Sequence, residues 1–99
     1  MAREIPLATP GEILKLEWLE PLGITEYALA KAIDVPATRI NEIVKGRRAI
    51  TADTALRFAA FFGTDAQSWL NLQSHYDIEA GRDLLSDSLA KIQPIRAAA

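Results

Sequence analysis

Ninety-nine residues, of which 49% are hydrophobic and 24% charged, make one domain of ordinary size with enough apolar side chains for a core. The sequence has no cysteine, which excludes disulfides and thiolate metal sites, and no apolar run long enough to cross a membrane. The first twelve residues lack the apolar core of a signal peptide, so we expect a cytoplasmic protein.

The formal net charge of −2 argues against a nucleic-acid binder, but the charge is unevenly distributed. Six basic and three acidic residues lie between Lys31 and Arg57, whereas the rest of the chain has five basic and ten acidic residues. Affinity for DNA depends on local Lys and Arg at phosphates, and not on the charge of the whole chain. The segment from Lys31 to Arg57 therefore stays a candidate for DNA binding.

The first eight residues show no helical period and are interpreted as an arm. A helix is predicted to follow, because Thr9 can cap it, Pro10 suits the first helical position and Glu12 occupies the capping-box position. We expect Trp18 and Leu22 to lie in the core. Pro21 and Gly23 are predicted to end the helix.

Two short amphipathic helices with few residues between them are predicted next, over residues 26–33 and 37–45. Thr25 can cap the first, Pro36 suits the start of the second, and Gly46 can end it. Such a pair is typical of a helix-turn-helix, whose second helix enters the DNA major groove. The alternative is an ordinary helical hairpin with a solvated polar face.

Three basic residues flank a glycine in the segment Lys45–Ile50 that follows. A loop of this kind can place cationic side chains and backbone N–H groups against phosphates, the alternative being a solvated charge cluster. A further helix is predicted from a Thr51 cap to Phe62, ended by Gly63.

Thr64 and Gln67 form a second capping-box pattern before a helix in which Trp69, Leu72 and Tyr76 share one face. These three side chains either close the core or contribute to a dimer surface. Gly81 weakens a continuous helix, yet apolar residues recur at helical spacing until Pro94. We expect this tail to pack on its own domain, a second copy or another protein through Leu84, Leu85, Leu89 and Ile92.

The chain shows no strand pattern, so the predicted fold is all-α with five or six helices. It divides into an arm (residues 1–8), a helix-turn-helix domain (9–77) and a C-terminal helical extension and tail (78–99). The sequence has no glycine-rich phosphate loop and no triad spacing, so we expect neither an enzyme nor a cofactor. The one histidine, His75, has no ligand partners that would indicate a metal site.

The order and spacing of several motifs resemble the HigA/VapI antitoxins, a branch of the phage-repressor-like (Xre) helix-turn-helix proteins. The resemblance covers about Pro10 to Asp77 and implies a lambda-repressor-like domain. The motifs that carry it are Pro10–Leu14, Leu19–Gly23, Leu29–Ala32, Arg39–Ile43, Gly46–Arg57, Trp69–Gln73 and Tyr76–Asp77.

The resemblance implies a homodimer that binds double-stranded operator DNA, represses its own operon and neutralises a RelE/HigB-like mRNA-cleaving toxin. It places five residues at DNA bases: Ala37, Thr38, Arg39, Asn41 and Glu42. It places five at phosphates: Thr25, Glu26, Lys45, Arg47 and Arg48. A dimer or partner surface is expected at Trp69, Leu72, Tyr76, Leu85 and Leu89.

One departure from the wider class concerns Glu26 and Ala37, where many repressors have glutamine. A phosphate would repel the Glu26 carboxylate, so only its backbone N–H is suited to that contact, and Ala37 offers only apolar contact, for instance to a thymine methyl. The alternatives are a stand-alone repressor without a toxin and a protein–protein adaptor that no longer binds DNA. The toxin is expected to contact the folded body, the arm or the tail.

Overall fold

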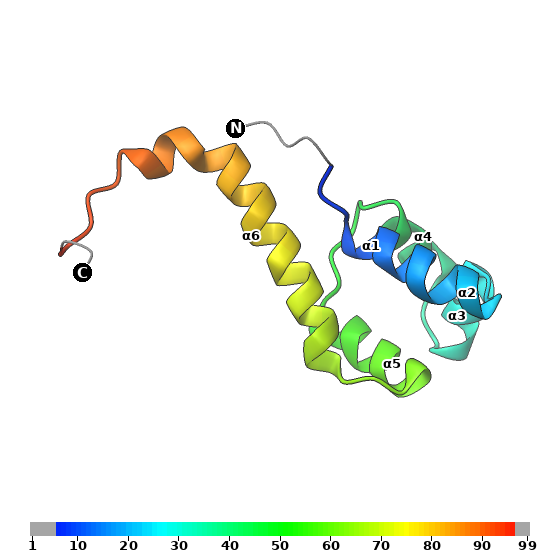
Figure 1. The fold of residues 1–99 in the computed structure, drawn as a ribbon. Helices are drawn as coiled ribbons and strands as arrows, with labels where there is room; N and C mark the ends of the chain where they lie inside the picture. The colour runs from blue at the N-terminus through cyan, green and yellow to red at the C-terminus, as the bar shows by residue number, and fades with distance from the viewer. Residues whose placement is uncertain (1–5, 97–99) are drawn as a thin grey trace.

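The computed structural model describes residues 6–96, and the rest of the expected arm and tail lies outside the described residues. Within this range the chain folds into five helices and no strand, which confirms the all-α prediction (Figure 1). The first helix is continuous but irregular, with α1 (Pro10–Ile13), a π-helical stretch (Leu14–Leu19) and α2 (Glu20–Leu22). The others are α3 (Glu26–Ala32), α4 (Ala37–Val44), α5 (Ala52–Phe62) and α6 (Ala66–Ala90).

The first helix begins as predicted, since the Thr9 hydroxyl oxygen accepts a hydrogen bond from the backbone N–H of Glu12 at 3.1 Å. It does not end at Pro21, which lies inside α2. The preceding π-helical turns use i→i−5 bonds, as from the Glu20 N–H to the Lys15 carbonyl. In a regular α-helix a proline ring would clash with the carbonyl four residues earlier, and the π-helical turns change that geometry. Gly23, in the left-handed region at φ 66°, ends the helix.

The core lies where α3, α4 and α5 meet the first helix and the start of α6, with Phe58, Leu14 and Trp69 at its centre. Trp18 is half-buried, and its ring packs 5.5 Å from that of Trp69 and 4.9 Å from that of Phe62. The prediction that Leu22 lies in the core is wrong, because its side chain is 57% exposed. It falls at the last residue of the helix, beyond the packed turns.

The predicted cap at Thr51 is confirmed in position only, and the predicted cap at Thr64 is wrong. Thr51 occupies the N-cap of α5 but its side chain makes no capping hydrogen bond. The N-cap of α6 is Asp65 and not Thr64, since the Asp65 carboxylate accepts from the Ser68 N–H at 2.6 Å. Hydrogen bonds from the side chain and the backbone of Ser68 lower the pKa of Asp65. The Thr64 hydroxyl is used otherwise, because it accepts from Nε1 of Trp69 at 2.8 Å.

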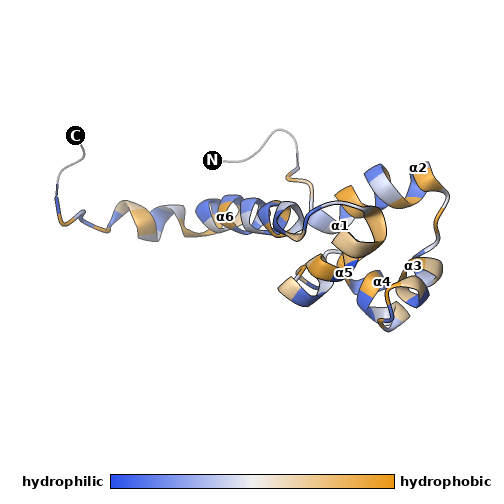
Figure 2. Ribbon diagram, turned by 90° about the horizontal axis from the view of Figure 1, so that it is seen from below, coloured by the Kyte–Doolittle hydropathy of each residue, from blue (hydrophilic) through white to orange (hydrophobic). Residues whose placement is uncertain are grey.

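Helix α6 passes through Gly81 without a break and crosses the expected boundary at residue 77. A glycine costs a helix interior only about 1 kcal/mol relative to alanine, which a long helix can absorb. The outer half of α6 extends away from the other helices, at the opposite end of the molecule from α3 and α4 (Figures 1 and 2). This projection accounts for the longest dimension of the protein, 50 Å against 27 and 21 Å.

Candidate nucleic-acid interface

The polar face of α4 points outward because its apolar face is fully used in the core. Ile40 and Ile43 are buried against the domain, and Ala30 of α3 is buried beside them. Ala37 and Thr38 at the start of α4 are exposed, whereas Arg39, Asn41 and Glu42 are half-buried. The structure thus brings the five predicted base-contacting residues together on one exposed helix.

The turn between α3 and α4 is tight, since Asp34 adopts the left-handed region at φ 60° and Pro36 caps α4. Its backbone is closed by the N–H of Val35, which donates to the Ala30 carbonyl at 3.0 Å. Aspartate tolerates this conformation better than most side chains. The short connection holds α4 across α3, as a helix-turn-helix requires.

Glu26 at the start of α3 is linked to the middle of α4. Nδ2 of Asn41 donates to Oε1 of Glu26 at 3.0 Å, and both side chains are half-buried. Thr25, beside it, caps α3 by accepting from the Ala28 N–H at 3.0 Å. The Glu26 carboxylate is therefore engaged within the protein, while Thr25 stays exposed at its surface.

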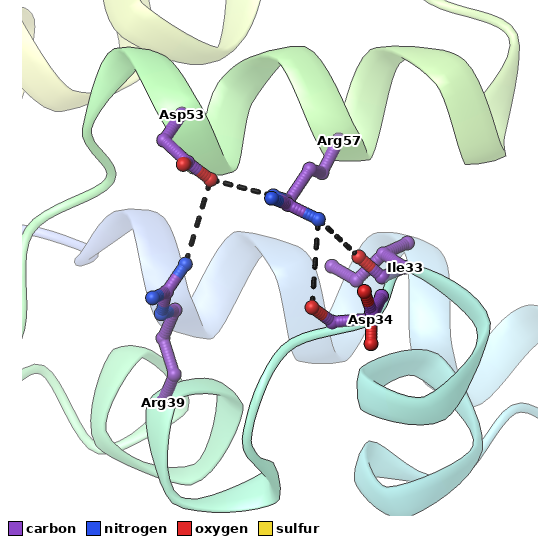
Figure 3. A network of polar contacts seen from close by, with 5 residues as sticks. All are labelled: Ile33, Asp34, Arg39, Asp53 and Arg57. Atoms are coloured by element: carbon purple, nitrogen blue, oxygen red, sulfur yellow. Dashed lines mark hydrogen bonds and ion pairs between the residues drawn. The ribbon is translucent and has the colours of Figure 1, made fainter.

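Arg39 is linked to α5 through a carboxylate that two arginines share (Figure 3). Oδ1 of Asp53 lies 2.6 Å from Nε of Arg57 and 3.5 Å from Nη1 of Arg39. The hydrogen bond from Arg57, with the positive charges of Arg57 and Arg39, lowers the pKa of Asp53. The Arg39 side chain is only 29% exposed and points from α4 toward this carboxylate on α5 (Figure 3).

The basic loop after α4 begins with a regular helix end. Gly46 adopts φ 76°, and the Arg47 N–H donates to the Glu42 carbonyl at 2.8 Å. Nε of Arg48 donates to Oε1 of Glu42 at 2.9 Å, while Lys45 and Arg47 are exposed. The three predicted phosphate-contacting cations thus lie together at the C-terminal end of α4.

The surface predicted for a dimer or partner divides into two opposite faces of α6. Trp69 is only 2% exposed and belongs to the core, so its assignment to a partner surface is wrong, because its indole fills the space between Trp18 and Phe58. Leu72 and Tyr76 are half-buried near it. Leu85 lies about 160° around the helix from Trp69 and is 47% exposed.

Three residues that position the candidate interface were not predicted to do so from the sequence. Asp53 was interpreted only as an acid suited to the start of α5, and Arg57 was counted only as a positive charge. The spacing of four residues between them could have indicated their ion pair. Gln73 of α6 accepts a hydrogen bond from the Ile50 N–H at 2.8 Å and so ties the basic loop to α6, a contact with no signal in the local sequence.

Together, the short α3–turn–α4 unit, the outward polar face of α4 and the basic loop define a helix-turn-helix protein. In agreement, residues 16–69 match the family described as helix-turn-helix. Virulence-associated protein I of Dichelobacter nodosus is 58% identical over 76 residues, which cover 77% of this chain and 70% of that protein. Antitoxin HigA-1 of Vibrio cholerae is 35% identical, over 86% of this chain and 80% of that protein.

Among solved structures, the Pseudomonas aeruginosa antitoxin HigA with the higBA promoter superposes with a TM-score of 0.86 at 39% identity. The match covers 90% of this chain and 98% of that one. The chain therefore belongs to the HigA/VapI antitoxin family of helix-turn-helix proteins. Within residues 6–96, no helix is both long and apolar enough to span a membrane.

Proposed function

We propose that this protein is a cytoplasmic antitoxin that binds a palindromic operator upstream of its own gene as a symmetric dimer. It represses its operon and neutralises a RelE/HigB-like toxin that cleaves mRNA. The observation that carries the DNA-binding part is the outward face of α4, with Arg39 and Asn41, directly beside the basic loop. A homologue with the same fold has been solved with its promoter DNA.

In the proposed complex, each protomer inserts α4 into a major groove, and the two helices lie about 34–36 Å apart, one turn of DNA. Arg39 and Asn41 contact base edges because guanidinium and amide groups can bind them through two hydrogen bonds. Ala37 offers its methyl group to a thymine methyl. Phosphates are contacted by Thr25 and by the cations of the loop, Lys45, Arg47 and Arg48.

The outer half of α6 is the proposed site of dimerisation. Ile78, Leu85 and Leu89 lie along one side of it and are all at least 45% exposed. Burial of such a stripe against its copy would remove apolar area from water. Because this half of α6 lies away from α3 and α4, pairing there leaves both α4 helices free for DNA (Figure 1).

The proposed toxin partner is supported by charge. The sequence outside Lys31–Arg57 has twice as many acidic as basic residues, ten against five. An enzyme that cleaves mRNA needs a positively charged surface for its polyanionic substrate. The net negative charge of this part of the antitoxin is opposite in sign to such a surface.

The DNA-binding proposal is tested by fluorescence anisotropy with the duplex upstream of the gene and a scrambled duplex, at two salt concentrations. We expect tight binding to the native duplex alone and a steep fall in affinity with salt. Arg39→Ala should weaken native binding roughly 10-fold or more and scrambled binding much less. Equal losses on both duplexes would show that Arg39 does not contact bases, and equal wild-type binding to both would refute sequence-specific binding.

The antitoxin proposal is tested separately, by searching the flanking DNA for a short gene that encodes a basic protein and co-expressing the two genes. We expect the two products to co-purify and the antitoxin to restore growth that the neighbour alone arrests. Sequence-specific DNA binding without a neighbour that arrests growth would instead identify a stand-alone repressor.

A further inference from the structure

The hydrogen bond between Asn41 and Glu26 fixes the orientation of the Asn41 amide. A carboxylate can only accept, so the group that faces Oε1 of Glu26 at 3.0 Å must be the Nδ2 amino group of Asn41. The Oδ1 atom must then point the other way. The assignment of the amide thus follows from the chemistry of its partner, across fifteen residues of sequence and two helices.

The bond to Glu26 leaves one acceptor and one donor of the half-buried Asn41 side chain for another partner. They are Oδ1 and the second hydrogen of Nδ2. In the major groove, adenine presents a donor, N6–H₂, beside an acceptor, N7, whereas guanine presents two acceptors. Cytosine offers a donor alone, and thymine an acceptor with a methyl group. Only adenine matches both remaining groups of Asn41 at once.

We propose that Glu26 is a positioning residue that makes Asn41 a reader of adenine, and that the Glu26 side chain does not contact phosphate. The inference rests on the proposed insertion of α4 into the major groove. A carboxylate at this surface lowers affinity for every DNA sequence, because it repels phosphates. The Glu26 carboxylate also prevents the 180° rotation of the Asn41 amide that would allow Asn41 to bind guanine.

The inference is tested with Glu26→Gln, Asn41→Ala and the wild-type protein, on native duplexes in which each A·T pair is replaced in turn by G·C. For the wild type, one replacement in each half-site should lower affinity about 10- to 100-fold through loss of the contact to Asn41. Asn41→Ala should lose most of the effect of that replacement. Glu26→Gln should reduce the effect of that replacement several-fold, because glutamine can donate as well as accept and lets the Asn41 amide rotate.

Glu26→Gln should also bind the scrambled duplex more tightly, since it removes one negative charge from each protomer. Glu20→Gln is the matched control, because it removes the same charge from an exposed position on α2. It should leave the adenine preference unchanged. Circular-dichroism melting of each variant verifies that it is folded.

Two outcomes would overturn the inference. Either Glu26→Gln keeps the full wild-type preference for adenine, or Asn41→Ala keeps it. Both presuppose a wild-type protein that distinguishes native from scrambled DNA. A wild-type protein that binds both duplexes equally would instead refute the proposed function, so the two failures can be told apart.

Discussion

Arg57 of α5 donates a hydrogen bond from Nη1 to the carbonyl oxygen of Ile33, at 2.8 Å, where α3 ends (Figure 3). The same nitrogen lies 3.4 Å from the carbonyl oxygen of Asp34, the residue in the left-handed conformation. The carboxylate of Asp53 accepts a hydrogen bond from Nε of the same guanidinium. The Arg57 side chain thus joins the helix-turn-helix turn to α5, and the Asp53 carboxylate also reaches Arg39 on α4.

Replacement of Arg57 by methionine should destabilise the protein by about 1–3 kcal/mol. Methionine keeps part of the aliphatic stem but leaves the half-buried Ile33 carbonyl without its side-chain donor, and an unpaired buried polar group costs about this much. Chemical denaturation gives the free energy of unfolding. Asp53→Asn, which leaves the Arg57 bonds to the turn intact, should cost less. A cost for Asp53→Asn equal to that for Arg57→Met would contradict the proposed role of the carbonyl contacts.

Acid should weaken the fold partly through Asp53. Its pKa is lowered from 3.8 in the folded protein, so the folded state binds fewer protons than the unfolded state in this range. The contribution of Asp53 to the free energy of unfolding is complete at pH values above its pKa in the unfolded state. It begins to fall as the pH approaches 3.8, and it is lost as the pH falls through the lower pKa of the folded state. Asp53→Asn should therefore flatten the dependence of the free energy of unfolding on pH below about pH 5. Identical slopes for both proteins would contradict this prediction.

Gly11→Ala and Gly81→Ala should have opposite effects on stability. A Cβ atom at Gly11 would lie 1.8 Å from the Ile43 carbonyl oxygen, whereas at Gly81 no described atom lies within 4 Å of it apart from its chain neighbours and the backbone of its own helix. Gly11→Ala should force the first helix away from α4 and cost about 1–3 kcal/mol, as overpacking does. Gly81→Ala should stabilise α6 by up to about 1 kcal/mol through helix propensity. Thermal melts compare the two, and destabilisation by both would show that Gly81 lies at a close contact between copies.

Leu85→Glu should weaken the proposed dimer without unfolding the protomer, because Leu85 is 47% exposed on the stripe of α6. Leu84→Glu is the matched control, since Leu84 is 85% exposed and lies about 100° around the helix. Light scattering after size-exclusion chromatography gives the mass of each variant. A shift to monomer is expected for Leu85→Glu alone, and a shift for Leu84→Glu alone would place the interface on another face.

The sequence alone determined the local features of this protein. Helix starts at Thr9 and Thr25, the end at Gly46 and the outward face of α4 all follow from rules that act within one or two turns. The family also follows from the sequence, because the order and spacing of the motifs are specific even though each motif is common. Local rules failed at Pro21, where the neighbouring π-helical turns changed the geometry, and at Thr64, whose hydroxyl bonds the indole of Trp69 five residues later.

Only the tertiary structure decided which side chains meet. The carboxylate of Glu26 accepts from Asn41 fifteen residues later, a contact that the sequence did not predict. Asp53 lies in the first turn of α5 as expected, but it also links α5 to α4 through Arg39. The structure likewise placed Trp69 in the core and Leu85 on the opposite face of the same helix. Each of these contacts depends on how helices cross, and a crossing is fixed by the packing of the whole core, which no short stretch of sequence specifies.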